Sequence, residues 1–355
     1  MYFKKPLHPF KTASATQREH FRTFSPKPQT ESNQTSPPYR MKNTVTRTVI
    51  IGTGAVGTSI AYSLILQGVV AEIALIGGHN PNKPFGEALD MQHSMEFQER
   101  NVRIFPADYS ACRDADIVIL TAAPPSDGER DRMKMMHRSA EVIRDVVPRV
   151  MEHGFDGIFI VVTNPVDVMA YLVHRLSGLP KQRIIGTGTV LETARLKYAI
   201  GKLMRMDPRS VDCYVMGEHG DSMMVPWSHA RAGGKNFIDI MKDNPDRLQG
   251  VTLEQLVEET KYAGRTVLNA KGNTQYAIAS AVTRIVKTIL HDDNLILPVS
   301  AYLEGEYGES GIFCGVPAIL NRKGIKDIGE FHLTEEEYTQ FHHSAKIIRK
   351  AIAQL

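Results

Sequence analysis

Short apolar runs alternate with stretches of helical period over the first half of the chain. Each apolar run is strand-sized, and each is followed by a segment with one apolar face. The runs cover residues 48–51, 72–76, 117–122 and 157–163, and the helical stretches cover 59–67, 86–97, 140–152 and 168–176. This alternation predicts βαβ units around a parallel sheet, which is an α/β fold.

The second half of the chain is less regular and predicts a smaller α+β unit. Helices are expected at 191–204, 253–268 and 275–290. Capping-box spacing, with Thr252 three residues before Gln255 and Thr334 three before Glu337, marks two helix starts. The last helix carries an apolar stripe that predicts docking on the body of the protein. The stripe consists of Tyr338, Phe341, Ala345, Ile348 and Ile352.

Composition narrows the class of protein. The chain has 355 residues, of which 42% are hydrophobic and 23% charged, so it is expected to be globular with about two domains. No apolar run reaches the ~18 residues that a membrane-spanning helix needs. Three separated cysteines give neither a disulfide framework nor a metal-binding pattern. We therefore expect no membrane partner and no metal.

The basic charge of the chain belongs to its first 40 residues. That segment holds seven of the 42 basic and two of the 39 acidic residues, which leaves residues 41–355 with a net charge of −2. The body thus has no electrostatic reason to bind nucleic acid. Residues 1–40 fit a disordered tail, an organellar targeting peptide, or an extension before a true start at Met41. Pro-rich stretches disfavour a targeting helix, so a cytoplasmic protein is expected.

A glycine-rich turn joins the first strand to the first helix. Gly52 permits a tight turn, Gly54 allows the backbone to approach a pyrophosphate, and Gly57 allows close packing of helix on strand. With Ala55 and Val56 between them, these residues place phosphates at a helix N-terminus. A plain glycine turn is the alternative. The required strand and helix on either side favour a Rossmann-type, doubly wound dinucleotide domain over residues 41–186, with a substrate domain over 187–355.

The carboxylate expected after the second strand is missing. Such a residue normally binds the adenine ribose hydroxyls, and Gly77 stands at this position. A 2′-phosphate is then not repelled, and His79 or Lys83 are candidates to meet it. We expect NAD, because no arginine lies in this segment, but NADP remains open.

One histidine, His219, is flanked by glycines that leave its ring room to meet a ligand. Upstream, Glu192 and Arg195 have the i, i+3 spacing that places both on one helix face. A carboxylate there orients a histidine and raises its pKa, and a guanidinium binds a substrate carboxylate in bidentate fashion. The alternative for the two upstream residues is a surface ion pair.

Two further segments are candidates for the same site. The polar stretch 124–132 contains Gly128 and suits a lid that carries a cation over a substrate, although a solvated loop is the alternative. Asn164 follows the run at 157–163, at the carboxyl ends of the strands where ligands bind in such sheets.

These residues give the chain a resemblance to the L-lactate/malate dehydrogenase family from residue 48 to the C-terminus. Within the family it most resembles the L-lactate and L-2-hydroxyisocaproate branches. The stretch at 217–222, Gly-Glu-His-Gly-Asp-Ser, is the most specific part of the resemblance. Further matching segments are 52–57, 86–90, 114–119, 163–167, 186–189 and 271–272.

The resemblance implies a role for each candidate. His219 is the proton donor and acceptor, Arg195 binds the substrate carboxylate, and Arg132 polarises the carbonyl, with Arg130 as the alternative. Asn164 contacts substrate and cofactor, and Thr274 lines the pocket. The resemblance also implies a homotetramer, with a dimer as the fallback.

Departures from the family pattern bear on the substrate. The histidine's partner is Glu192 where the family has aspartate, and residues 125–127 carry neither the glutamine of lactate enzymes nor the arginine of malate enzymes. Asp127 disfavours a second substrate carboxylate. The function expected is L-lactate dehydrogenase, then a dehydrogenase of larger 2-hydroxy acids, then malate dehydrogenase. An inactive nucleotide-binding protein is the alternative from another class.

Overall fold

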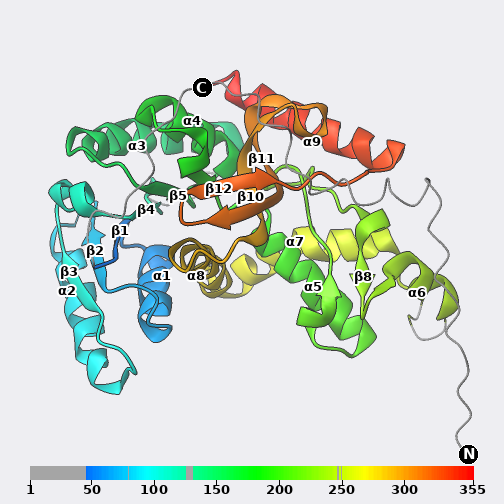
Figure 1. The fold of residues 1–355 in the computed structure, drawn as a ribbon, viewed down its shortest axis with the longest axis horizontal. Helices are drawn as coiled ribbons and strands as arrows, with labels where there is room; N and C mark the ends of the chain where they lie inside the picture. The colour runs from blue at the N-terminus through cyan, green and yellow to red at the C-terminus, as the bar shows by residue number, and fades with distance from the viewer. Residues whose placement is uncertain (1–44, 79, 125–130, 246–247, 249) are drawn as a thin grey trace, which may run out of the picture.

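A nine-stranded sheet with helices on both faces forms the centre of the protein (Figure 1). The computed structural model describes residues 45–78, 80–124, 131–245, 248 and 250–355. Its strands are β1 Arg47–Ile51, β2 Glu72–Ile76, β3 Arg103–Pro106, β4 Ile117–Leu120, β5 Ile158–Val161, β6 Ile184–Gly186, β7 Val211–Asp212, β8 Arg231–Ala232, β9 Lys235–Asn236, β10 Leu295–Glu304, β11 Ser310–Asn321 and β12 Gly324–Ile328. Its α-helices are α1 Ala55–Leu66, α2 Asn82–His93, α3 Arg132–Glu152, α4 Val166–Ser177, α5 Val190–Met204, α6 Phe237–Asp243, α7 Leu253–Lys271, α8 Tyr276–Leu290 and α9 Glu335–Ile352.

The large sheet is parallel in its first six strands and antiparallel in its last three. The order is β12-β11-β10-β6-β5-β4-β1-β2-β3, and β1 pairs in parallel with both β2 and β4. This order is that of a doubly wound dinucleotide fold, so the predicted fold class is confirmed. The antiparallel extension was not predicted. It joins the parallel part where Ser300 of β10 pairs with Gly186 of β6.

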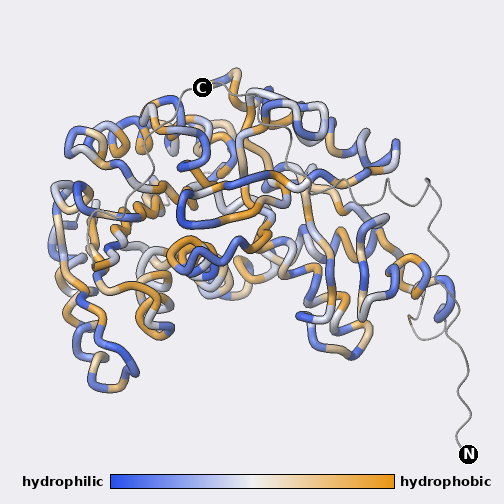
Figure 2. Tube along the Cα trace, viewed as in Figure 1, coloured by the Kyte–Doolittle hydropathy of each residue, from blue (hydrophilic) through white to orange (hydrophobic). Residues whose placement is uncertain are grey.

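Each face of the sheet is covered by its own helices. Ile50 and Ile119 point to a core that includes residues of α1 and α8, and Val49 and Val118 point to a second core with α3 and α4. The strands are therefore apolar on both sides, as strands buried between two helix layers are. Figure 2 shows hydrophobic, orange trace along these strands.

A smaller lobe lies at one end of the sheet and contains β7, β8, β9, α5, α6 and α7 (Figure 1). It has its own core of buried residues, among them Leu196, Val215 and Phe237. The capping boxes at Thr252 and Thr334 both form, so these predicted starts of α7 and α9 are confirmed.

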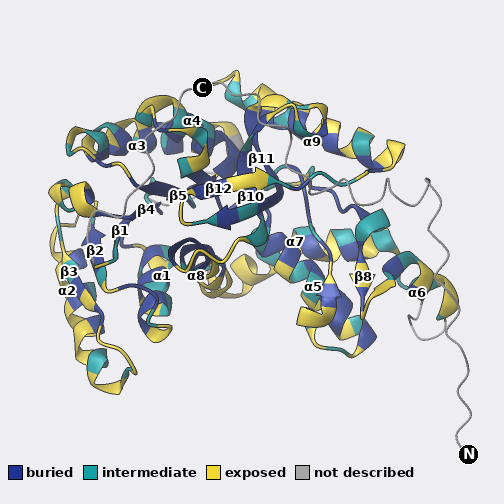
Figure 3. Ribbon diagram, in the orientation of Figure 1, coloured by how far each residue is buried: buried dark blue, intermediate teal, exposed yellow. Residues whose placement is uncertain are grey.

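The last helix docks on the body through its predicted stripe. Phe341, Ala345 and Ile348 are buried against β11, with Tyr338 and Ile352 packed against the same core. Figure 3 shows α9 buried along one side and exposed along the other. Among the described residues, no helix is long and apolar enough to cross a membrane.

Besides α2, which begins at Asn82 rather than at residue 86, two helices begin earlier than their patterns predicted. The first helix was expected from residue 59, but α1 begins at Ala55, inside the glycine turn. The third was expected from residue 140, but α3 begins at Arg132 because the Asp131 side chain accepts the backbone N–H groups of Met133 and Lys134. In both cases a polar or glycine-rich first turn hides the helical period.

Candidate active site

The glycine turn has the geometry that a dinucleotide pyrophosphate requires. Gly52 has a φ of +111°, and a Cβ built there would lie 2.7 Å from the backbone nitrogen of Ala122. A Cβ on Gly57 would lie 1.9 Å from the carbonyl oxygen of Gly52, so only glycine lets α1 approach this closely. A Cβ on Gly54 would meet nothing within 4 Å, which leaves open space beside the first turn of α1. The turn thus fits an NAD pyrophosphate at the helix N-terminus.

A neighbouring side chain also explains why no carboxylate follows β2. A Cβ on Gly77 would lie 2.4 Å from Cγ of Pro84, in the first turn of α2. Proline therefore occupies the space into which a ribose-binding side chain would project. Lys83 lies beside this position, with Asn80 and Asn82, in a polar depression of about 370 Å³. His79, the other candidate named from the sequence, lies outside the described residues.

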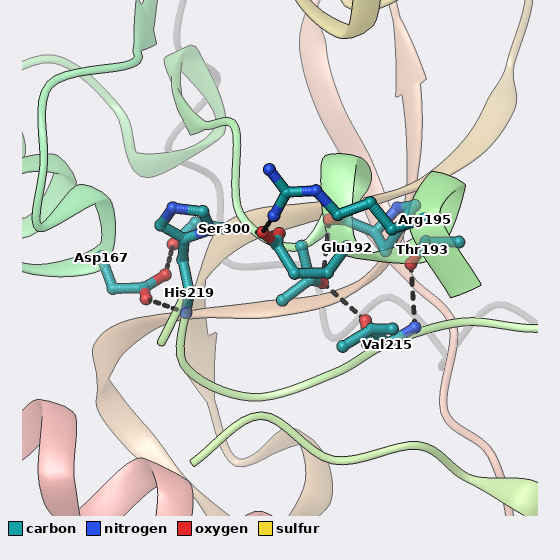
Figure 4. A network of polar contacts seen from close by, with 9 residues as sticks. Asp167, Glu192, Thr193, Arg195, Val215, His219 and Ser300 are labelled. Carbon is teal, nitrogen blue, oxygen red and sulfur yellow. Dashed lines mark hydrogen bonds and ion pairs between the residues drawn. The ribbon is translucent and has the colours of Figure 1, made fainter. Parts of the chain in front are cut away.

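The centre of the site is a carboxylate shared between an imidazole and a guanidinium (Figure 4). Oε2 of Glu192 lies 3.1 Å from Nδ1 of His219, and Oε1 of Glu192 accepts a hydrogen bond from Nη1 of Arg195 at 3.0 Å. Glu192 and Arg195 are one turn apart on α5, as their spacing predicted. Because Nδ1 faces the carboxylate, Nε2 of His219 is the nitrogen left to meet a ligand.

Burial and charge act in opposite directions on this cluster. Burial lowers the pKa of His219, and the charge of Arg195 lowers it further. The charge and hydrogen bond of Glu192, with a smaller contribution from the charge of Asp167, raise it by more, so the pKa is raised to about 9. Burial favours the neutral form of Glu192, yet His219 and Arg195 hold the pKa of its carboxyl below the usual range. The imidazole is therefore protonated at neutral pH in the free protein, ready to donate a proton.

A second buried carboxylate, which the sequence analysis did not assign, holds the backbone of His219. Oδ2 of Asp167, in the first turn of α4, accepts the His219 backbone N–H at 2.8 Å. Its Oδ1 accepts the hydroxyl of Ser300 on β10 at 2.5 Å. The sequence signal for this role was an aspartate between two valines, Val166 and Val168, at the start of a helix, and the sequence analysis did not use it.

The C-terminal helix holds the segment that carries His219. Oγ of Ser344, on α9, accepts the backbone N–H of Glu218 at 2.6 Å and lies 3.1 Å from Oγ of Ser222. A Cβ on Gly217 would lie 2.5 Å from the same hydroxyl, and the φ of Gly217 is +94°. The glycine before Glu218 is thus needed for the close approach of α9.

The structure describes no contact between this cluster and the other predicted residues. Asn164 is exposed after β5, in a cis peptide bond with Pro165, at the carboxyl edge of the sheet. Thr274 is half-buried between α7 and α8. Arg132 is the first residue of α3, but its side chain and all of Arg130 lie outside what the structure describes.

Comparison with known proteins agrees with this arrangement. The family model for the lactate/malate dehydrogenase NAD-binding domain matches residues 46–186, and that for the α/β C-terminal domain matches residues 189–355. The chain belongs to the lactate/malate dehydrogenase family. The resemblance drawn from the sequence is confirmed, and the family is one of NAD-dependent oxidoreductases that act on a 2-hydroxy acid.

Relatives within the lactate/malate dehydrogenase family cover almost all of the described chain. It is 40% identical to L-lactate dehydrogenase 2 of Bacillus anthracis over 88% of this chain and 99% of the relative. Identity to L-lactate dehydrogenase 3 of the same species is 43%, over 87% and 98%. Among solved structures, the ligand-bound minor L-lactate dehydrogenase of Enterococcus mundtii superposes with a TM-score of 0.84, at 41% identity and with 88% and 99% covered.

Proposed function

We propose that this dehydrogenase is an L-lactate dehydrogenase that interconverts pyruvate and lactate. The observation that carries the proposal is the shared carboxylate of Glu192, which presents a protonated imidazole and a guanidinium side by side. A 2-oxo monocarboxylate has one group for each cation. Its carboxylate pairs with Arg195, and its carbonyl oxygen takes a proton from Nε2 of His219.

In the proposed mechanism each residue acts at a stated atom. Arg195 anchors the substrate carboxylate through paired N–H donors. Arg132, at the start of α3, stabilises the negative charge that develops on the carbonyl oxygen. His219 donates its proton to that oxygen in reduction and takes it back in oxidation. Asn164 and Thr274 line the substrate pocket, and bound nicotinamide supplies or accepts the hydride at the substrate C2.

Initial rates with three 2-oxo acids test the proposal. We expect pyruvate to be reduced fastest, 2-oxoisocaproate more slowly and oxaloacetate slowest. A fastest rate with 2-oxoisocaproate favours the second candidate, a dehydrogenase of larger 2-hydroxy acids, which residues 125–127 support because they lack the glutamine of lactate enzymes. A fastest rate with oxaloacetate refutes the interpretation of Asp127, and no turnover with any 2-oxo acid favours a nucleotide-binding protein without activity.

Cofactor choice forms a second part of the proposal. NAD is the cofactor that the family implies, and Gly77 provides no carboxylate to repel the 2′-phosphate of NADP. We therefore expect NADH to bind more tightly than NADPH, because no arginine lies in this segment to meet the 2′-phosphate, but by no more than about tenfold. Titration of nicotinamide fluorescence measures both constants, and a preference for NADH of about 100-fold contradicts the proposed tolerance.

Self-association into a homotetramer, or into a dimer as the simpler alternative, is also proposed. Large apolar side chains are exposed on α2, α7 and the start of α8, as surfaces that pack against another copy often have. They include Phe85, Leu89, Tyr262, Leu268 and Tyr276. Light scattering is expected to give about four or two times the 39.6 kDa chain mass, and a monomer mass contradicts this part.

A cytoplasmic location completes the proposal. Its support is that Cys112, Cys213 and Cys314 are all buried and free, as is usual for proteins of a reducing compartment. Fluorescent fusions with and without residues 1–40 test it, since a targeting segment would send only the longer fusion to an organelle.

A further inference from the structure

Asp167 is a buried carboxylate that the proposed mechanism leaves without a task. Only 3% of the residue is exposed, yet both its oxygens accept hydrogen bonds, one from the His219 backbone and one from Ser300. Burying a carboxylate is costly unless hydrogen bonds and opposite charges compensate it. Two donors on two different segments, with a protonated imidazole nearby, meet that requirement.

The contacts of Asp167 join the parts of the fold that form the site. Asp167 lies on α4, three residues after Asn164, whereas its donors lie on β10 and on the segment that carries the imidazole. Ser300 is itself fixed in place, because it lies within β10 and pairs with Gly315 of β11 on one side and Gly186 of β6 on the other. The carboxylate is therefore held between rigid elements, and it fixes the backbone position of His219.

We propose that Asp167 is a positioning residue for proton transfer. From α4 it holds the backbone of His219 in place, and it puts a second negative charge near the imidazolium. In Figure 4 it lies on the other side of His219 from Glu192 and Arg195. The inference rests on the proposed function of His219 as the proton donor. It assigns Asp167 no contact with substrate.

The titratable groups around the imidazole and Asp167 come from four segments. Glu192 and Arg195 face it from α5, and Asp167 faces it from α4. Glu218, beside His219 in the chain, and Cys314 of β11 interact with Asp167 in turn, and burial keeps the Cys314 thiol neutral by raising its pKa well above the ordinary value.

Asp167 is charged in the pH range where the imidazole works. Burial raises the pKa of the Asp167 carboxyl, the donors and His219 oppose that rise, and the result is about 6. Above that pH its charge adds to that of Glu192 in stabilising the protonated ring.

The test replaces the charge and keeps the shape. In Asp167→Asn the amide oxygen still accepts the His219 N–H, and the amide nitrogen donates to Ser300, so the hydrogen bonds remain while the charge is lost. We expect the pKa of His219 to fall by about 0.5–1 unit, as removal of a nearby opposite charge does. Two readouts measure it: NMR titration of the imidazole carbons, with the His219 signal assigned by its absence in His219→Gln, and the alkaline limb of kcat/KM for pyruvate reduction.

The matched control is Asp116→Asn. Asp116 is also buried and accepts a backbone N–H, that of Arg47, but it precedes β4 at the amino ends of the strands. We expect no change in the His219 titration there. Asp167→Ser, which keeps an acceptor oxygen in a smaller side chain, is a second neutral variant should asparagine not be tolerated.

The measurements test the inference about Asp167 and the proposed function of His219 separately. An unchanged His219 titration in the neutral Asp167 variants, or an equal shift in Asp116→Asn, overturns the inference. The proposed function fails separately, if His219→Gln keeps wild-type turnover. Since NMR measures the imidazole without turnover, these failures are distinguishable.

Discussion

Replacing Glu192 by glutamine is expected to move the pH profiles of both reaction directions to lower pH, so that between the two pKa values reduction slows while oxidation speeds up. Glu192→Gln keeps the length of the side chain and removes its charge. Of the described residues, Glu192 is the one that contacts both the imidazole of His219 and the guanidinium of Arg195. Its loss therefore changes the protonation of His219 more than any other single change in the cluster.

The size of the effect follows from the pKa of His219. Burial lowers that pKa, and Glu192 with help from Asp167 raises it to about 9, from an ordinary 6.5. Because burial lowers it by more than Asp167 raises it, the pKa without Glu192 falls to 6.5 or below. The difference corresponds to about 3 kcal/mol of stabilisation of the imidazolium. At pH 8 the protonated fraction falls from about 0.9 to about 0.03 or less.

The assay is kcat/KM against pH in both directions, because this ratio reports the free enzyme. Pyruvate reduction needs the protonated ring, so wild-type activity falls as pH rises through about 9, and in Glu192→Gln it falls by about pH 6.5. Lactate oxidation needs the neutral ring, so its rise with pH moves down by the same interval. An equal loss in both directions at every pH, or a limb that stays in place, refutes the reasoning.

A matched control is available on the surface. Glu309 contacts Nδ1 of His342 at 2.7 Å and Nη2 of Arg349 at 2.5 Å, which repeats the same trio of residue types away from the site. Glu309→Gln is expected to leave both pH profiles unchanged. A shift of similar size there would mean that the profiles report general loosening of the protein.

Three further predictions test other parts of the site. Arg195→Gln is expected to raise the KM for pyruvate by about 10²-fold or more, because a buried charge pair with the substrate is lost. The control Arg209→Gln, at an exposed arginine paired with Asp207, is expected to leave KM unchanged. An unaltered KM in Arg195→Gln would mean that Arg195 does not bind the substrate. Ser344→Ala is expected to lower the free energy of unfolding, measured by urea denaturation, by about 1–3 kcal/mol, because the Glu218 N–H loses its acceptor. The control Ser280→Ala, on the exposed side of α8, is expected to have little effect. Equal stabilities of the two variants would contradict the claim that α9 holds the segment that carries His219. Arg132→Gln is expected to lower kcat by about 10²-fold or more and Arg130→Gln to have little effect, as measured by pyruvate turnover, and the reverse order would make Arg130 the lid residue.

Four of the six parallel strands were predictable because their signals are local, whereas β3 and β6 were not predicted. A buried strand is an apolar run, and a helix on a sheet has one apolar face, so β1, β2, β4 and β5 and their helices follow from periodicity. The antiparallel strands were not. β10 and β11 pair through residues such as Ser300 and Gly315, and β10 joins the sheet beside β6, a contact between segments more than 100 residues apart that no local pattern encodes.

Within the site, the sequence was enough to find residues with an unusual local pattern, but not residues whose hydrogen-bond partners are distant in the chain. The Glu192–Arg195 pair was visible from its i, i+3 spacing, and His219 from its glycines. Asp167 and Ser344 were not, since their partners are 52 and 126 residues away. A buried polar side chain becomes informative only once the element that it touches is known.

The carboxylate of Glu192 interacts with two cations at once. From its position on α5 the side chain reaches both His219 and Arg195, whose guanidinium lies 3.1 Å from where a Cβ of Gly264 on α7 would be. The net charge of the cluster is zero when the ring of His219 is protonated, because two carboxylates, Glu192 and Asp167, balance two cations. When the ring is neutral, the net charge is −1. A 2-oxo carboxylate that binds Arg195 therefore meets less repulsion in the protonated state and stabilises that state in return. Substrate binding and proton loading are coupled by this charge balance, so the KM for pyruvate should rise with pH through the pKa of His219 even where every residue stays in place.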